Sequence, residues 1–267
     1  MQESGYVERG LTGPQVISLP IPALPFRTPA RRQAFAGPVI ASSWTASWQK
    51  RALDIAVSFF ALAILGLPMA LIAVAVRLSS PGPAVFVQKR VGRGGELFSI
   101  YKFRSMRVSP GTGPGPGPGL TRVGDTRVTA VGRLLRKLKL DELPQLYNVL
   151  RGDMSLIGPR PKLPRYAESH PMPFRPGLSG AATLAFRNEE DLLSHVHAAR
   201  LDDFYDRFIR PAKTKIDLEY MARATFLSDL RVIKSTLLAC VVPDARPSGV
   251  LGDMSVADPG VSYQSMN

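Results

Sequence analysis

The chain is poor in cysteine, in histidine and in acidic residues. Its 267 residues include one cysteine, Cys240, and three histidines. A single thiol excludes an intrachain disulfide and a zinc site built from several cysteines, and it is typical of a reducing compartment. His195 and His197 are two residues apart, so on a helix they point to different sides and are not expected to share a metal. No apolar stretch follows Met1, so a cleaved secretory signal is not expected either.

Basic residues, by contrast, are abundant. The chain has 34 Lys and Arg against 21 Asp and Glu, a formal net charge of +13. Such a balance favours an anionic partner, which could be nucleic acid, a phosphorylated substrate or acidic lipid. Most of the excess lies between residues 84 and 165. This region lacks interleaved aromatic residues and any known groove-reading motif, so no nucleic-acid partner is expected.

The run from Ile55 to Val76 contains no charged residue. As a helix it would be about 33 Å long, enough to cross the bilayer core. Basic residues flank it on both sides, which places both ends on the cytoplasmic side by the positive-inside rule. Pro68 lacks a backbone donor and favours a bend. From these residues alone two topologies stay open, a spanning anchor with a tolerated proline and a re-entrant helix that bends at Pro68.

The composition divides the chain into four regions. Residues 1–46 are rich in proline and lack apolar periodicity, which predicts a disordered arm, and residues 243–267 predict a disordered tail. Residues 47–82 form the predicted membrane helix. Residues 83–242 form a predicted cytoplasmic domain at the membrane interface. The proline- and glycine-rich stretch 109–119 within it predicts a surface loop without a role in chemistry.

Local patterns predict a mostly helical α+β fold. Apolar residues in 84–88 and 97–103, around a glycine-rich connection, predict a small β-hairpin. Helical periodicity begins at Val131 and appears again over 201–209, where Pro211 is expected to end the helix, and a longer helix is predicted over 213–240. These helices lie in a core or, in a membrane-attached protein, at the lipid surface as interfacial amphipathic helices. Cys240, near the end of the last one, is expected to pack inside.

Asp141 and Glu142 are adjacent carboxylates in the otherwise cationic string KLKLDELPQL. One interpretation is structural, because acidic residues in the first turn of a helix through LPQLYNVL offset the helix macrodipole. The other is phosphoryl transfer, in which a carboxylate attacks phosphorus while a divalent cation and arginine neutralise the phosphoryl oxygens. Arg160, in the turn GDMSLIGPRP, could hold phosphate with its planar guanidinium. Asp153 is expected to support that turn.

Three strings make the sequence recognisable: IYKFRSM (100–106), RVTAVGRLLRKLKLDELPQLYNVLRGDMSLIGPRP (127–161) and RPGLSG (175–180). Together with the basic flank and the proline-interrupted apolar run, they closely resemble the bacterial sugar transferases, that is, the monotopic phosphoglycosyl transferases. The resemblance covers residues 49 to 240.

The resemblance implies transfer of a hexose-1-phosphate from a UDP-sugar to undecaprenyl phosphate, which initiates exopolysaccharide, capsule or related glycan synthesis. It implies a ping-pong mechanism in which Asp141 becomes covalently linked to the phosphosugar and Glu142 serves the required Mg²⁺. By similarity Arg136 and Arg160 hold the phosphates, with Lys102 as a weaker candidate. The implied location is the cytoplasmic face of the bacterial inner membrane, with a monotopic, re-entrant helix that bends at Pro68. Anionic lipid is an expected partner, and a homodimer is compatible with the resemblance.

The sequence departs from the family pattern at three places. Leu67 stands where a serine often precedes the proline, Phe186 stands where many relatives have glycine before Arg187, and the 109–119 loop matches nothing with a role. A function from another class also stays open. In it the protein is a non-enzymatic membrane scaffold, the acidic pair starts a helix, and the basic region binds anionic lipid.

Overall fold

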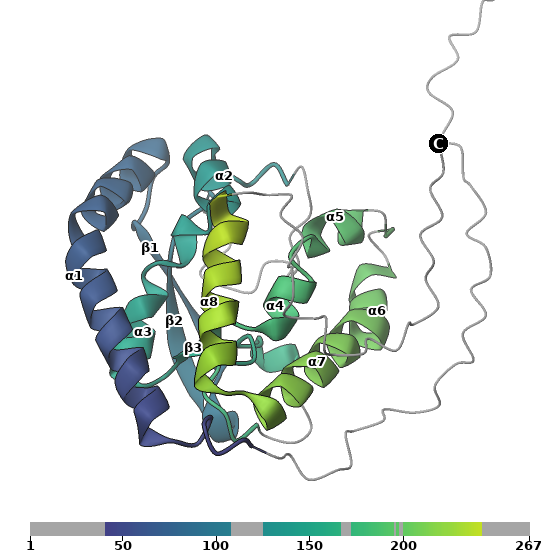
Figure 1. Ribbon diagram of the computed structural model, residues 1–267. Coiled ribbons are helices and arrows are strands. Elements are labelled where there is room, and N and C mark those ends of the chain that lie inside the picture. The colour runs from purple at the N-terminus through teal and green to yellow at the C-terminus, as the bar shows by residue number, and fades with distance from the viewer. Residues whose placement is uncertain (1–40, 108–124, 167–171, 195, 198–199, 242–267) are drawn as a thin grey trace, which may run out of the picture. The chain divides into compact units, whose positions relative to one another are not determined.

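The structure, a computed structural model, describes residues 41–107, 125–166, 172–194, 196–197 and 200–241 (Figure 1). The predicted tail, the 109–119 loop, His195 and the predicted arm up to residue 40 lie outside the described residues. The elements are α1 Trp48–Ser79, β1 Val85–Val91, η1 Arg93–Gly95, β2 Leu97–Phe103, α2 Ala130–Lys137, η2 Leu140–Glu142, α3 Gln145–Arg151, β3 Ser155–Ile157, η3 Pro164–Tyr166, β4 Gly177–Ser179, α4 Ala181–Ala185, α5 Glu189–Ser194, α6 Leu201–Phe204, the π-helical turn η5 Tyr205–Ile209, α7 Arg210–Arg223 and α8 Phe226–Val241.

The apolar run forms the long helix α1. The Ser47 side chain starts it by accepting a hydrogen bond from the Lys50 backbone N–H at 3.1 Å, and the helix continues through Pro68. Its length and apolar composition suffice to cross a membrane, and little of its most apolar part is buried. Ile64 and Leu67 are 74% and 73% exposed. Because a long row of exposed apolar side chains is unfavourable in water, α1 suits a lipid environment.

Charged groups fix both ends of α1 to the rest of the fold. Near its start, Lys50 Nζ lies 2.5 Å from Oδ2 of Asp229 on α8, and both side chains are buried. At its end, Arg104, which follows β2, donates to the backbone oxygens of Ser80 at 2.5 Å and Pro81 at 2.8 Å. The two ends of the apolar helix therefore contact the same folded domain.

The predicted β-hairpin is confirmed. Strands β1 and β2 pair antiparallel, with Val85 opposite Phe103 and Val91 opposite Leu97. The connection needs Gly94, whose φ of 66° lies in the left-handed region that favours glycine. Strand β2 turns Ile100, 2% exposed, into the core. The hairpin thereby holds the following lysine, Lys102, at a fixed place beside the core.

A second, parallel strand pair is not predicted by the sequence. Strand β3 pairs with β4, Ser155 opposite Gly177, and both strands are too short for a visible alternation. Gly158 lets the two segments approach closely, because a Cβ there would lie 2.6 Å from the Arg175 carbonyl oxygen. Helices α3 and α8 contact both strands of this pair, and Figure 1 shows β3 between them.

Two helix predictions are wrong in their boundaries. Pro211 does not end a helix, because it lies in the first turn of α7, where the wider π-helical turn η5 precedes it. A proline is tolerated there because the first N–H groups of a helix need no partner within it. The helix predicted over 213–240 is two helices. It breaks at Ala224, and Thr225 Oγ1 then accepts from the Ser228 backbone N–H at 3.2 Å, which caps α8.

Candidate active site

Three residues that are far apart in the sequence meet at one carboxylate oxygen. Glu142 Oε1 accepts hydrogen bonds from Lys102 Nζ at 2.8 Å and from Arg160 Nη2 at 2.6 Å. Lys102 comes from β2, Glu142 from the short turn η2, and Arg160 from the loop after β3. The fold thus brings together three of the residues named from the sequence.

The two cations determine the ionisation of Glu142. Burial raises the pKa of its carboxyl, but Arg160 and Lys102 outweigh burial and hold that pKa well below its usual range. Burial also lowers the pKa of the Lys102 ammonium, against the opposing effect of Glu142. Glu142 is therefore an anion at neutral pH, shared between two positive groups.

Asp141 lies in a different environment although it is the neighbouring residue. Its carboxyl is 8% exposed, and Oδ1 has no hydrogen-bond partner among the described residues. Burial and the negative charge of Glu142 raise its pKa, while Lys102, Lys139 and Arg136 oppose the rise. Arg136, the third cation named from the sequence, is thus near enough to act on Asp141. Two adjacent carboxyls whose pKa values move in opposite directions are suited to different chemical roles.

The backbone places the acidic pair in a turn, which corrects one expectation. Asp141 and Glu142 lie in the 3₁₀ turn η2, and α3 begins only at Gln145, after Pro144. Lys139 precedes the turn at φ 56°, a left-handed conformation unusual for a residue with a side chain. The acidic pair is therefore not part of the first turn of α3, and an offset of that helix dipole does not explain it.

A buried amide that the sequence analysis does not single out fixes α3 against β2. Asn148 Oδ1 accepts from the Tyr101 backbone N–H at 3.1 Å, and its Nδ2 donates to the Ser99 carbonyl at 2.8 Å. These bonds hold the part of β2 that comes just before Lys102 relative to the acidic pair. The sign of this role is that a polar side chain on the inner face of a short helix is fully buried. That burial is visible only in the folded structure.

The loop that carries Arg160 is held between the two sheets. The Gly177 backbone N–H donates to the Pro159 carbonyl at 2.8 Å, and the Val91 N–H donates to the Lys162 carbonyl at 2.9 Å. Asp153 does not support this loop as expected. It contacts Asn148 Nδ2 and Arg151 Nε, both at 3.2 Å, at the end of α3.

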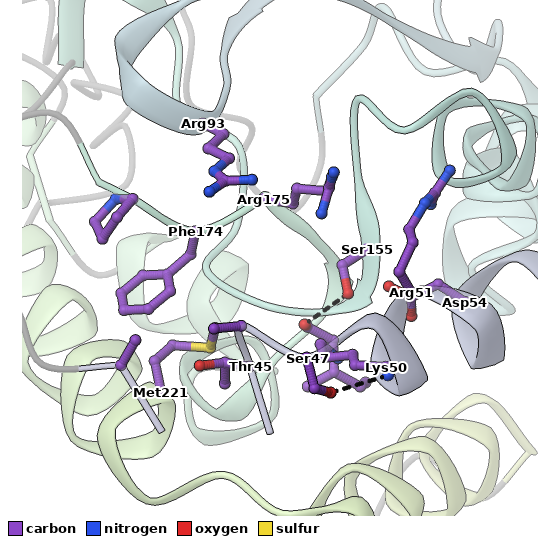
Figure 2. Close-up of a pocket in the computed structure, with 14 residues that line it drawn as sticks. Thr45, Ser47, Lys50, Arg51, Asp54, Arg93, Ser155, Phe174, Arg175 and Met221 are labelled. Atoms are coloured by element: carbon purple, nitrogen blue, oxygen red, sulfur yellow. Dashed lines mark hydrogen bonds between the residues drawn. The ribbon is translucent and has the colours of Figure 1, made fainter. Parts of the chain in front are cut away.

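A pocket of about 170 Å³ lies near the start of α1, at the opposite end of α3 from the acidic pair. Figure 2 shows Arg51, Arg93 and Arg175 around it. Arg51 donates to the carbonyls of Val149 and Leu150 at 2.6 and 2.9 Å, and Arg175 Nε donates to Gly152 at 2.9 Å. These are the last carbonyls of α3 and its cap, so two of the arginines stabilise the end of that helix.

The remaining residues named from the sequence are His197 and Cys240. In the part of the chain that the structure describes, no group of three or more His, Cys, Asp or Glu side chains is placed to hold a metal ion with protein ligands alone. His197 lies beyond the end of α5, so it is not on a helix. Cys240 is partly buried near the end of α8, and burial raises the pKa of its thiol.

Comparison with known proteins gives consistent matches. The chain is similar to the UDP-N-acetylgalactosamine-undecaprenyl-phosphate N-acetylgalactosaminephosphotransferase of Aeromonas hydrophila, with 38% identity over 70% of this chain and 42% of that protein. The UDP-glucose:undecaprenyl-phosphate glucose-1-phosphate transferase of Caulobacter vibrioides is 45% identical over 50% of this chain and 52% of its own length. The chain thus spans about half the length of these curated relatives.

A third relative is matched over nearly its whole length. The exopolysaccharide production protein PSS of Rhizobium leguminosarum bv. phaseoli is 34% identical over 71% of this chain and 94% of that protein. The family model described as bacterial sugar transferase matches residues 45–243, which include α1, the hairpin, the acidic pair and the Arg160 loop. The chain therefore belongs to the bacterial sugar transferase family.

Proposed function

We propose that this protein transfers a hexose-1-phosphate from a UDP-sugar to undecaprenyl phosphate and so initiates synthesis of an exopolysaccharide, capsule or related glycan. The observation that carries the proposal is the geometry of the acidic pair. Asp141, a buried carboxyl whose Oδ1 has no hydrogen-bond partner among the described residues, lies next to an anion, Glu142, that Lys102 and Arg160 both contact. The names of the relatives supply the substrate class, since two of them act on UDP-sugars and undecaprenyl phosphate.

Asp141 is suited to be the nucleophile. A carboxylate with a raised pKa is more basic than usual, and its oxygens attack phosphorus more readily once deprotonated. No donor among the residues that the structure describes is hydrogen-bonded to its Oδ1 atom, so the lone pairs of that oxygen are available for attack. In the first displacement an Asp141 oxygen forms a bond to the phosphorus that bears the sugar, and the bond from that phosphorus to the oxygen of UMP breaks.

The second displacement restores the enzyme. An oxygen of undecaprenyl phosphate bonds to the phosphorus held on Asp141, and the phosphorus–oxygen bond to Asp141 breaks, which regenerates the carboxylate and leaves a lipid diphosphate sugar. Two steps allow one site to use a soluble donor and then a lipid acceptor in turn. Arg160, Lys102 and Arg136 would offset the phosphate charges in both steps, and a guanidinium can hold two phosphate oxygens at once.

The residues present fit a magnesium ion. Mg²⁺ binds carboxylate oxygens together with substrate phosphates, and the pair offers two carboxyls, with Asp141 Oδ1 lacking a donor. Glu142, with Asp141 beside it, would hold the ion, whose positive charge would stabilise charge on the phosphoryl oxygens.

We further propose that α1 enters and leaves the bacterial inner membrane on its cytoplasmic face. The buried Lys50–Asp229 pair holds one end of the helix, and Arg104 holds the other. If α1 spanned the bilayer, these charged contacts would lie on opposite sides with the polar domain between them, which is unfavourable in hydrocarbon. A re-entrant course that bends at Pro68 avoids this, and the basic residues of the domain would then lie near anionic lipid headgroups.

The proposal is tested by incubating membranes that contain the protein with undecaprenyl phosphate, Mg²⁺ and radiolabelled UDP-glucose or UDP-N-acetylgalactosamine. The expected result is label in the organic phase and release of UMP. A scaffold that only binds lipid would consume neither donor and would bind anionic vesicles without Mg²⁺ dependence. A phosphatase would leave the label in water as sugar phosphate.

A further inference from the structure

The segment of residues 159–161, which presents Arg160, has a single backbone donor. Pro159 and Pro161 flank Arg160 and have no backbone N–H, so within these three residues the Arg160 N–H alone can donate. The Asp217 carboxylate on α7 receives a backbone hydrogen bond from Arg160. The same carboxylate accepts from the Ala182 backbone N–H at 3.1 Å through Oδ1.

Asp217 is thus a junction between three segments. It lies on α7, it receives the N–H of Ala182 in the first turn of α4, and it receives the N–H of the loop after β3. The side chain is 5% exposed. One turn earlier on α7, Thr214 Oγ1 accepts from Lys162 Nζ at 2.8 Å, so α7 contacts the loop at a second point.

We infer that Asp217 is a positioning residue that fixes the backbone from which the Arg160 guanidinium reaches Glu142. This inference rests on the proposed function, because it assigns Arg160 to the phosphates of the donor. A guanidinium on a loop reaches a defined place only when the backbone below it is held, and small displacements of a phosphate-binding group lower rates strongly.

A buried carboxylate at this position lowers the stability of the fold, which argues against a purely structural role. Burial raises the pKa of Asp217 to about 7, with Lys162 and Lys213 as the nearby cations that oppose the rise. A charged carboxylate held in such a place destabilises the fold relative to a neutral amide of the same shape. Residues that lower stability while fixing a functional group are typical of active sites.

Two variants distinguish a role of Asp217 in positioning the Arg160 loop from a role in folding. Asp217→Asn keeps the size of the side chain and one acceptor oxygen but replaces the second acceptor with an NH₂ donor. Asp54→Asn is the matched control. Asp54 is also a buried carboxylate, 3% exposed, and it accepts a backbone N–H, that of Leu156 at 3.1 Å, but it does not hold the Arg160 loop.

The first measurement is a double-mutant cycle in the full-length, membrane-reconstituted protein, with UDP-glucose or UDP-N-acetylgalactosamine as donor. We expect Arg160→Ala to lower kcat/KM by roughly 10²–10³-fold and Asp217→Asn by roughly 10–10²-fold. The double variant should match Arg160→Ala within about twofold, because the two residues act as one unit. Asp54→Asn should stay within about twofold of the wild type, and the melting temperature of Asp217→Asn at pH 8 should not fall.

The second measurement does not depend on activity. Hydrogen exchange of the backbone over residues 158–163 should be faster in Asp217→Asn than in the wild type and unchanged in Asp54→Asn. If Arg160→Ala retains activity, or no donor is used, the proposed function fails while the exchange experiment still decides the inference. Unchanged exchange overturns the inference, as do losses that multiply in the double variant or an equal loss in Asp54→Asn.

Discussion

The Nη2 atom of Arg160 lies 2.6 Å from Oε1 of Glu142, and this contact joins the loop after β3 to the acidic turn η2. Because Lys102 approaches the same oxygen, Glu142 is held as an anion. That anion in turn raises the pKa of Asp141. In this arrangement Glu142 stays ionised and Asp141 is the more basic carboxyl. This difference has several consequences that can be measured.

Replacing the basic carboxyl should abolish transfer. Asp141→Asn removes the attacking oxygen anion, so both UMP release and lipid labelling should fall to background, a loss of at least about 10³-fold. The matched control is Asp153→Asn, whose carboxylate contacts Asn148 and Arg151 at the end of α3. It should keep activity within about threefold of the wild type.

Peptide mass spectrometry of wild-type protein quenched with donor alone should locate a phosphosugar on Asp141. Undiminished turnover by Asp141→Asn, or an adduct on another residue, would disprove the covalent mechanism.

Removing Lys102 should shift the pH dependence of activity. Lys102→Met takes away one of the two cations that lower the pKa of Glu142, so that pKa rises. Lys102 also lowers the pKa of Asp141. The ionised fractions of both carboxyls therefore fall at acidic pH in the variant, and the acid limb of the kcat/KM profile should move to higher pH. We expect a loss of about tenfold at pH 7 and more at pH 6. Lys89→Met, on the exposed side of the same hairpin, should leave the profile unchanged. An acid limb that stays in place would mean that Glu142 ionisation does not govern the reaction.

The sequence predicts much of this site because its signals are local. The apolar run, the glycine-rich hairpin connection and the acidic pair in a cationic string each follow from neighbouring residues, and the resemblance adds Lys102, Arg136 and Arg160. The continuation of the helix through Pro211 could not be predicted, because a π-helical turn upstream accommodates the proline. The pairing of β3 with β4 could not be predicted either, because strands of three residues are too short to show an alternation of apolar and polar side chains.

Buried polar groups are the other class that sequence patterns miss. Asn148 and Asp217 lie on the buried faces of their helices next to apolar residues, and each binds backbone groups of other segments. Those partners come from segments distant in the chain, so the contact exists only in the folded protein. A polar residue at an apolar position of a helical period is the one sign that the sequence offers.

Stability should respond to the titration of Asp217. Its folded pKa is about 7, against 3.8 for the ordinary side chain. Between these values the folded protein retains a proton that the unfolded chain has released, so stability falls as pH rises from about 4 through about 7. Thermal melting from pH 5 to pH 8 should therefore show the melting temperature of Asp217→Asn gaining on that of the wild type as pH increases. A difference that is constant across this range would place the pKa of Asp217 elsewhere.

The buried ion pair near the start of α1 should matter for folding. Asp229 accepts from Lys50 Nζ at 2.5 Å, from Trp44 Nε1 at 2.9 Å and from the Tyr220 hydroxyl at 2.6 Å. Lys50→Met leaves a buried carboxylate without its counter-ion, which should lower the free energy of unfolding by about 3–5 kcal/mol. The control is Lys215→Met, which breaks an exposed pair with Glu219 and should change stability by less than about 1 kcal/mol. Urea denaturation in detergent, followed by tryptophan fluorescence, measures both. Equal effects of the two variants would show that the pair is not a stabilising contact.

The membrane topology of α1 can be determined by testing from which side of the membrane a thiol reagent reaches each of its two flanks. Single cysteines are introduced as Thr45→Cys and Ala84→Cys in a Cys240→Ser background, so that each protein carries one thiol at a known end of the helix. Because the charged contacts of Lys50 and Arg104 tie both ends to one polar domain, both thiols should react with an impermeant maleimide only when the cytoplasmic side is exposed, as in inside-out vesicles. Pro68→Ala restores a backbone donor in the middle of the run and tests whether the proposed re-entrant course depends on the proline. Labelling of the two positions from opposite sides in the otherwise wild-type sequence would establish a spanning helix, and would require the contacts at one end of α1 to be absent in the membrane.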